Sequence, residues 1–427
     1  RRGEVYGRTP ASAAGSPRQN RRTSGTDLSS DGSVENTWTD VYSSLLLRHS
    51  EKLHILPSAE LQPSADSLYK DLYVYQLECP TKVIEWTSGR TVCVAGYGSS
   101  KNEILELRLP PKLFANENKG LCAERDFKVV HGGFTDGPVH CLKHVPGTRC
   151  VVSNDGRSSE LQVWELGGED SDVIRRTGSV AGRSVVSEGG SRIAARLSSQ
   201  PQVLHGARSG DVQLTELTSG QPLYKLETDS ADPLSSLQFV TDAVFLACCC
   251  NGNVYIADTR TAAAPQLSPP PVSSGESVLW WTDASSGSSC LDPTSCRIVR
   301  LSSSGQAVIS DLRNQREAAS QAQLDVQSHH CNLDDVTVSW APALDGCIAV
   351  SGFSGAVQIY NTSVWRTELQ EAQPLFQHRG HTVSSQPDDG VFVTSHVWHP
   401  ERPRTLLSAA SDGSVHVWDW VDQSAGS

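Results

Sequence analysis

Two clusters of side chains in this sequence are of the types that bind metals. His329, His330 and Cys331 offer imidazole and thiolate groups, the usual ligands of transition metals, and Cys290 and Cys296 lie in a serine-rich segment. A structural metal site needs four converging ligands. Neither group is accompanied by a second cluster of matching short spacing, and there is no Cys-x-x-Cys pair. We therefore expect a solvated loop around 329–331 and no bound metal.

A second chemistry that the residue types allow is ester hydrolysis. The run His131–Phe134 (HGGF) resembles the backbone oxyanion loop of some esterases, in which small residues let amide N–H groups face a developing charge. His381, Ser408 and Asp412 could form a Ser–His–Asp triad. The chain has no G-x-S-x-G nucleophile motif and no G-x-x-x-x-G-K-[ST] phosphate loop. We therefore expect a turn between β-rich units at 131–134, no cofactor, and no enzyme activity.

The bulk composition narrows the class of protein. With 37% hydrophobic and 20% charged residues the chain is globular, and no run reaches the roughly 18 apolar residues that a membrane span needs. Adjacent cysteines at 248–250 in an apolar run predict buried, reduced thiols, hence a cytoplasmic or nuclear compartment. The formal net charge of -12 opposes a large nucleic-acid-binding face. We expect a soluble protein without a membrane partner.

The chain divides into three parts by its patterning. Residues 1–65 form an N-terminal extension whose first 36 residues have too few apolar side chains to order, so we expect a flexible tail there. Within it a helical spacing of apolar residues predicts a short amphipathic helix at Trp38, Val41, Tyr42, Leu45 and Leu46. Residues 66–422 consist of short β-rich runs separated by Gly, Asn, Asp and Ser turns, and 423–427 are a C-terminal tail.

The β-rich part contains a repeat, and its last unit is the clearest. This unit begins at Gly380-His381 and continues through two apolar strands at 397–400 and 406–411. An Asp412-Gly413 turn leads into a third strand, which ends at Trp418-Asp419. Weaker copies of the strand, turn, strand pattern occur at 94–107, 151–165, 203–216, 245–258, 299–311 and 348–361. Together these units predict an all-β protein, a seven-bladed β-propeller.

Two further features follow from the propeller prediction. The units recur at intervals longer than the roughly 40 to 45 residues typical of such repeats, so some loops must be enlarged. The Pro-rich 262–276 and the Ser/Gly-rich 283–297 are the obvious insertions. The alternating run 72–77 reads as a strand, and we predict that it forms the outermost strand of the final blade and closes the ring.

The closing unit resembles a WD repeat. In WD repeats the equivalents of His381, Ser408, Asp412 and Trp418 form a hydrogen-bonded tetrad that joins the strands of one blade. The resemblance therefore assigns these residues a structural role, and the apparent triad is better explained as part of this tetrad. We expect a mutation at Ser408 to reduce stability rather than turnover.

Several stretches resemble the family of WD repeat-containing protein 73 over roughly residues 66–422. They are 101–105, 118–128, 131–134, 203–208, 340–342, 348–360 and 398–420. The resemblance implies a non-catalytic, cytoplasmic scaffold linked to microtubule organisation and cell division, at spindle poles and the cleavage furrow, and allows a nuclear pool. It also implies association with microtubule-associated components and with the endonuclease pair of the Integrator RNA-processing complex.

Binding by a propeller is expected from the loops that it presents around a rigid ring. Charged and aromatic residues in the expected loops could anchor a partner protein: Arg125, Phe127, His131, Phe134, Arg379, Arg402 and Arg404. Each of them taken singly is equally well explained as holding a loop to its blade or lying in solvent. Two alternatives to a protein-binding scaffold stay open, a hydrolase built on a propeller and an adaptor that binds RNA directly.

Overall fold

The computed structural model of this chain describes residues 69–96, 102–110, 127–168, 170–183, 190–271, 278–285, 296–314, 317–326, 333–383 and 390–421. The chain divides into two compact units, Arg1–His54 and Ile55–Ser427, and all described residues belong to the second. The predicted helix at 38–46, Arg125, Cys290, the cluster 329–331 and the tail 423–427 lie outside the described residues. No helix in the described ranges is long and apolar enough to cross a membrane.

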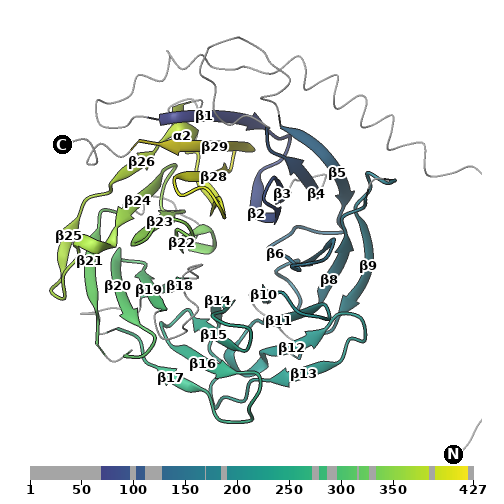
Figure 1. Ribbon diagram of the computed structural model, residues 1–427, viewed down its shortest axis with the longest axis horizontal. Helices are drawn as coiled ribbons and strands as arrows, with labels where there is room; N and C mark the ends of the chain where they lie inside the picture. The colour runs from purple at the N-terminus through teal and green to yellow at the C-terminus, as the bar shows by residue number, and fades with distance from the viewer. Residues whose placement is uncertain are drawn as a thin grey trace, which may run out of the picture. The chain divides into compact units, whose positions relative to one another are not determined.

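Seven antiparallel sheets, the blades, are arranged around a common centre (Figure 1). Six blades have four antiparallel strands each. One blade has a fifth strand, which pairs in parallel with the outermost of its four antiparallel strands. In each blade the strand that comes first in the local sequence lies nearest the centre (Figure 1). The predicted seven-bladed β-propeller is therefore confirmed.

The blades take their strands in sequence order. Blade 1 consists of β2 (Thr81–Ser88), β3 (Thr91–Gly96), β4 (Glu103–Arg108) and β5 (Lys128–Phe134). Blade 2 consists of β6 (Cys141–His144), β7 (Cys150–Asn154), β8 (Leu161–Glu165) and β9 (Arg175–Val180). Blade 3 consists of β10 (Arg192–Ala195), β11 (Gln202–Gly206), β12 (Gln213–Glu216) and β13 (Pro222–Lys225). Blade 4 consists of β14 (Leu234–Phe239), β15 (Val244–Cys249), β16 (Val254–Asp258) and β17 (Gln266–Ser268).

Of the last three blades, two include a strand from outside their own stretch of sequence. Blade 5 consists of β18 (Trp280–Ala284), β19 (Arg297–Ser302), β20 (Gln306–Asp311), β21 (Ser320–Leu324) and β25 (Gln370–Ala372). Blade 6 consists of β22 (Thr337–Trp340), β23 (Cys347–Ser351), β24 (Val357–Asn361) and β26 (Phe376–His378). Blade 7 consists of β27 (Val393–Trp398), β28 (Thr405–Ala410), β29 (Ser414–Trp420) and β1 (Tyr69–Gln76). The one α-helical turn described is α2 (Gly380–Val383), and 3-10 turns occur at Ser209–Asp211, Leu333–Asp335 and Thr362–Val364.

The second strand of a blade is buried on both faces because a neighbouring blade packs on each side of it. β28 is buried at every position, and β15 at every position but its first. Cys248 and Cys249 lie in β15 as buried thiols, as the apolar run predicted, whereas Cys250 follows the strand and is half-buried. A strand of this kind therefore reads as a continuous apolar run rather than an alternating one.

The hydrophobic core consists of clusters between blades rather than one centre. Seven clusters of buried residues are found in the described part of the chain, and each draws its side chains from two neighbouring blades. One cluster joins Ile84 and Val92 of blade 1 to Leu407 of blade 7, and so closes the ring. Each blade therefore buries its apolar surface only when both of its neighbours are in place.

The ring closes through β1. This strand pairs antiparallel with β29, with Leu72 opposite Trp418 and Gln76 opposite Ser414. The Leu77 N–H donates to the carbonyl of Gly413 at 2.9 Å. The predicted outermost strand at 72–77 is thus confirmed, and each of the seven predicted strand, turn, strand units corresponds to the second and third strands of one blade.

Two predictions about loops are wrong. The Pro-rich segment 262–276 is not only an insertion, because its residues 266–268 form β17, the outer strand of blade 4. The run 131–134 lies inside β5 and pairs with β4, so it is a strand rather than a turn. In the second predicted insertion, 283–284 belong to β18 and 297 begins β19, while 286–295 lie outside the described residues.

Candidate functional site

The closing blade contains a buried hydrogen-bonded network. Ser408 Oγ in β28 lies 2.8 Å from His381 Nε2 and accepts a hydrogen bond of 3.1 Å from Trp418 Nε1. His381 comes from α2 and Trp418 from β29, so one hydroxyl joins three elements. The sequence placed these three residues together, and the structure brings them into direct contact.

Asp412 joins this network only indirectly. Its Oδ1 accepts from Ser414 Oγ at 2.6 Å, and that hydroxyl lies 2.7 Å from His381 Nδ1. The tetrad inferred from the WD resemblance is therefore a set of five residues, with Ser414 between the carboxylate and the imidazole. The signal for Ser414 was present in the sequence, because it follows the Asp412-Gly413 turn at the start of β29.

The same network cannot work as a hydrolytic triad. Ser408 and His381 are both 0% exposed, so a substrate has no access to the hydroxyl. Ser408 Oγ is also held by the indole of Trp418, and Asp412 does not contact the imidazole directly. Burial lowers the pKa of His381 to about 3, which makes it a poor general base near neutral pH.

Three buried histidines, one of which is His381 of this network, could be read as metal ligands. Ring nitrogens of His378, His381 and His416 lie within 4.8 Å of one another. The rings of His381 and His416, however, stack in parallel at 3.8 Å, and imidazole lone pairs lie in the ring plane, so the two rings do not aim at one ion. His378 Nε2 lies 3.0 Å from His416 Nδ1, and its Nδ1 lies 2.8 Å from the hydroxyl of Tyr69. The arrangement fits a hydrogen-bonded core of neutral imidazoles.

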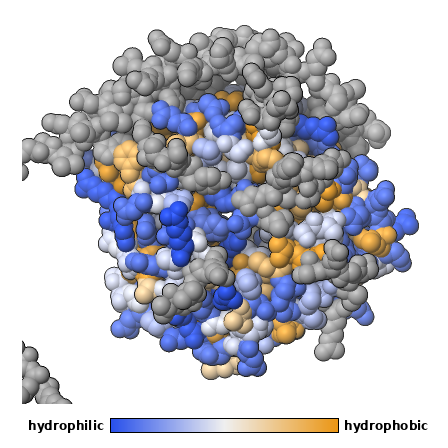
Figure 2. All heavy atoms as spheres, turned by 180° about the vertical axis from the view of Figure 1, so that it is seen from behind, coloured by the Kyte–Doolittle hydropathy of each residue, from blue (hydrophilic) through white to orange (hydrophobic). Residues whose placement is uncertain are grey.

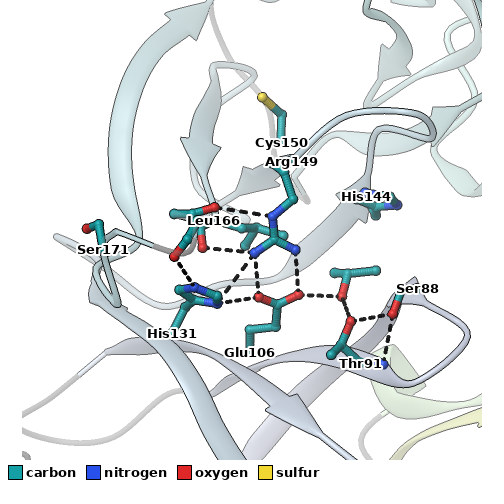
Figure 3. Close-up of polar contacts among 12 residues, drawn as sticks. Ser88, Thr91, Glu106, His131, His144, Arg149, Cys150, Leu166 and Ser171 are labelled. Atoms are coloured by element: carbon teal, nitrogen blue, oxygen red, sulfur yellow. Dashed lines mark hydrogen bonds and ion pairs between the residues drawn. The ribbon is translucent and has the colours of Figure 1, made fainter.

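A second polar cluster joins blade 1 to blade 2 (Figure 3). Glu106 of β4, only 1% exposed, accepts two hydrogen bonds from the Arg149 guanidinium at 2.9 and 2.7 Å, and Thr87 donates to it at 2.8 Å. His131 Nδ1 of β5 lies 2.6 Å from the same carboxylate. Arg149 also donates to the carbonyls of Leu166 and Gly167 in the chain that leaves β8. The cluster therefore fixes the loop of one blade to two strands of another.

The protonation of Glu106 follows from this environment. Burial raises the pKa of the carboxyl, but the hydrogen bonds from Arg149 and Thr87 outweigh it and leave the pKa lowered. The same pairing raises the pKa of Arg149. The sequence contained no signal for this pair, because its members are 43 residues apart in different blades.

Charged groups also occur on the inner strands. Lys143 of β6 donates to Glu85 of β2 at 2.8 Å, and this carboxylate raises the pKa of Lys143, which keeps the amine protonated. Asp283 of β18 accepts from the Trp340 N–H at 2.7 Å, and burial raises its pKa to about 6. Sequence reasoning missed these residues. The protonated Lys143 is neither a base nor a nucleophile, so these three residues of the inner strands include no activated nucleophile.

Of the predicted partner-binding residues, Phe127 and His131 are held by contacts within the propeller. Phe127 is buried in the core between blades 7 and 1, with its ring 5.3 Å from that of Tyr75. His131 lies in β5 and is held by Glu106. The predicted loop position of His131 is therefore wrong. The expected loop is the outer strand of blade 1, β5, together with the residue just before it, Phe127.

The other predicted residues remain accessible where they are described. Phe134 ends β5 and is 45% exposed, Arg379 is exposed beside α2, and Arg402 and Arg404 are half-buried in the β27–β28 loop. Phe134 belongs to blade 1, Arg379 lies between β26 and α2, and Arg402 and Arg404 share one loop of blade 7. On the face in Figure 2, hydrophobic and hydrophilic groups of the described residues alternate over the surface. Hydropathy therefore does not single out one binding patch on that face.

No protein-family model matches the chain. The chain is similar to a Danio rerio protein described as Integrator complex assembly factor WDR73, with 49% identity over 359 residues, 83% of this chain and 94% of the relative. It is similar to proteins of the same description from Homo sapiens (42% over 366 residues, 83% and 95%) and Xenopus laevis (40% over 361 residues, 83% and 96%). With this identity over almost the whole of each relative, and with a seven-bladed propeller fold, the chain belongs to the WDR73 family of WD-repeat proteins.

Proposed function

We propose that this chain is a non-catalytic scaffold that takes part in assembly of the Integrator complex. The observation that carries the proposal is the similarity, at 40 to 49% identity, to proteins described as Integrator complex assembly factors. The match extends over 94 to 96% of these relatives, so it is not confined to one motif. An assembly factor holds other proteins, and a ring of seven blades offers many loops on one rigid frame for this purpose.

The site geometry agrees with binding rather than turnover. The apparent Ser–His–Asp set is buried and used to join strands, and the inner-strand Lys143 is held protonated by Glu85. Among the predicted partner-binding residues, Phe134 and Arg379 are exposed, and the two arginines of the β27–β28 loop are half-buried. We take these as the first candidates for contacts with an Integrator component.

Affinity purification of the tagged full chain, followed by mass spectrometry, tests the proposal. We expect Integrator subunits to be enriched over a tag-only control, and to be reduced by a combined Phe134→Ala, Arg379→Ala and Arg402→Ala variant that keeps the wild-type melting temperature. Absence of Integrator subunits from the wild-type sample would contradict the proposal. Full retention by the variant would contradict only the choice of surface.

The finer proposals rest on the family resemblance alone. We include the Integrator endonuclease pair as the expected partner, together with microtubule-associated components and a cytoplasmic location that extends to spindle poles and the cleavage furrow during division. Imaging of the fluorescently tagged chain through mitosis tests the location. A signal that never gathers at either structure would remove the link to cell division and leave the assembly proposal untouched.

A further inference from the structure

Two segments of this chain pair with the outer edge of a blade to which they do not belong by sequence. Residues 172–174, which follow β8, pair in parallel with β5 of blade 1. The Gly132 N–H donates to the Asp172 carbonyl at 2.9 Å, and the Ile174 N–H donates to the Gly132 carbonyl at 2.8 Å. β25, which lies between β24 and β26, pairs in parallel with β21 of blade 5, with Ala322 opposite Gln370 (Figure 1). The rim of this propeller therefore accepts short extended segments by backbone pairing.

The two segments, which we call rim straps, share a chemistry. Asp170 and Asp172 lie exposed in or beside the first, and Glu368 and Glu371 lie exposed in or beside the second. Each strap pairs over only about three residues. In both cases a short, extended segment with two exposed acidic residues occupies the edge, and the exposed Arg366, whose carbonyl accepts from the Gln321 N–H, precedes those of the second.

β9, the outer strand of blade 2, offers a comparable edge next along the rim. The sheet order ends at β9, and within the described ranges no other strand pairs with its outer side. Its residues Arg175 to Ser179 are all exposed, whereas a strand on a blade surface ordinarily alternates between buried and exposed. Both faces and the edge of this strand are therefore open to a partner, and an open edge is a template for strand addition.

β9 carries positive charge that neighbouring carboxylates neutralise only weakly. The strand carries Arg175 and Arg176 and no acidic residue. Arg176 lies 3.4 Å from Asp136 and 3.8 Å from Glu160, whose side chains are 88% and 51% exposed. Solvent-exposed pairs at these distances contribute little, so a carboxylate of a partner can replace them. Arg175 lies opposite the exposed Glu165 on β8.

The neighbouring outer strands are less suited to strand addition. β13 begins with Pro222, which has no N–H to donate, and β17 spans three residues between Pro265 and Pro269. β26 also spans three residues. β9 has six residues and no proline, so it offers more backbone donors and acceptors than these three strands. β1 of blade 7 is longer, with eight residues, but Tyr69, Leu72, Tyr73 and Tyr75 are half-buried and its one basic residue is followed by an acidic one.

We propose that the outer edge of β9 is a docking site for a short, extended, acidic segment of a partner protein, which adds as a parallel strand in the manner of the two rim straps. The backbone of β9 supplies the hydrogen bonds, and Arg175 and Arg176 select carboxylate side chains. The inference rests on the proposed function in one respect, because it takes the partner segment to come from an Integrator component. In the absence of any partner, the two arginines would serve only to protect an open edge from aggregation.

Hydrogen–deuterium exchange with purified Integrator complex as the probe tests the docking site directly. We expect the amides of 175–180 to become protected when the complex binds, and those of β13 to exchange as before. The Arg175→Glu, Arg176→Glu variant should weaken binding by about tenfold or more, because like charges then face each other. Lys225→Glu on β13 is the matched control and should leave the affinity unchanged. Equal melting temperatures of all three proteins verify that the rim is folded.

The outcomes separate the two ideas. If the complex binds while the amides of β9 exchange as in the free protein, the docking site is wrong and the assembly proposal stands. If Lys225→Glu lowers the logarithm of the affinity by half as much as the double variant, which reverses twice as many charges, the effect is one of net charge and the docking site is again wrong. If the wild-type chain does not bind the complex at all, both proposals are overturned.

Discussion

At the scale of single residues, Ser408 holds two buried groups at once. Its hydroxyl is the hydrogen-bond partner of His381 Nε2 and of Trp418 Nε1, and all three residues are almost fully buried. We expect Ser408→Ala to lower the free energy of unfolding by about 1–3 kcal/mol for each group left without a partner. Urea denaturation followed by tryptophan fluorescence measures this loss. Ser219→Ala, in the exposed β12–β13 turn, should change stability by less than about 0.5 kcal/mol.

The buried histidines make stability depend on pH. Burial lowers the pKa of His381 to about 3 and holds the pKa values of His378 and His416 well below their usual range. An unfolded histidine titrates near ~6.5, so below that pH the unfolded chain binds more protons and stability falls as the pH falls. Asp283, with its pKa raised to about 6, opposes this trend between about pH 6 and 4, and burial also raises the pKa values of Asp211 and Asp419. The histidines with lowered pKa values outnumber these carboxyls.

We therefore expect the melting temperature to be lower at pH 5 than at pH 7.5. His416→Gln removes one of the titrating groups, so the difference between the two pH values should be smaller in this variant. Scanning calorimetry or circular dichroism of both proteins provides the measurement. Identical melting temperatures of the wild type at both pH values would show that these imidazoles do not remain neutral in the folded state.

At the scale of elements, β1 is the strand whose loss should lower the stability of the propeller most. It is the fourth strand of blade 7, and Tyr73 and Tyr75 of this strand pack against the core shared by blades 7 and 1. We expect a truncation that removes residues 70–78 to lower the melting temperature by several degrees, because it exposes the edge of β29. Addition of a synthetic peptide of residues 69–78 should recover part of the loss. An unchanged melting temperature would contradict the role of β1 in closing the ring.

The junction of blades 1 and 2 gives a second test at this scale. Glu106→Gln keeps the size of the side chain but removes the charge that Arg149 and His131 face, so we expect a loss of about 1–3 kcal/mol in the free energy of unfolding. Glu85→Gln is the matched control. Its partner Lys143 is 41% exposed, and the loss should stay below about 1 kcal/mol. Equal losses in the two variants would show that burial of the pair does not matter.

The elements also show what a sequence pattern can predict. Pairs of adjacent strands joined by short turns were recognised correctly in all seven blades, because turn residues and apolar runs are local signals. The outer strands of the blades were harder to recognise from the sequence. β5 contains HGGF and β17 lies in a Pro-rich segment, and both were expected as turns or insertions. Outer strands are exposed, so the burial that produces a periodic pattern is weak there.

At the scale of the whole molecule, every core cluster belongs to two blades, and the chain of clusters is closed by the one between blades 7 and 1. Loss of one blade therefore uncovers apolar surface on both neighbours. We expect the propeller to unfold in one transition, with coincident curves from tryptophan fluorescence and from far-ultraviolet circular dichroism. The chain truncated at 70–78 should show a broader transition or two separated ones. Separate transitions in the wild type would mean that blades are stable alone.

The sequence by itself determined the class of fold, the number of blades, the closing strand and the family. These depend on turn residues, apolar runs and the motif around Trp418, which are all local in the chain. Only the tertiary structure decided which polar residues of neighbouring blades meet, as Glu106 and Arg149 do, and which segments form the straps on the rim. The physical reason is that these contacts join separate blades, and no local pattern encodes which edges and side chains the packing of one blade on the next brings together.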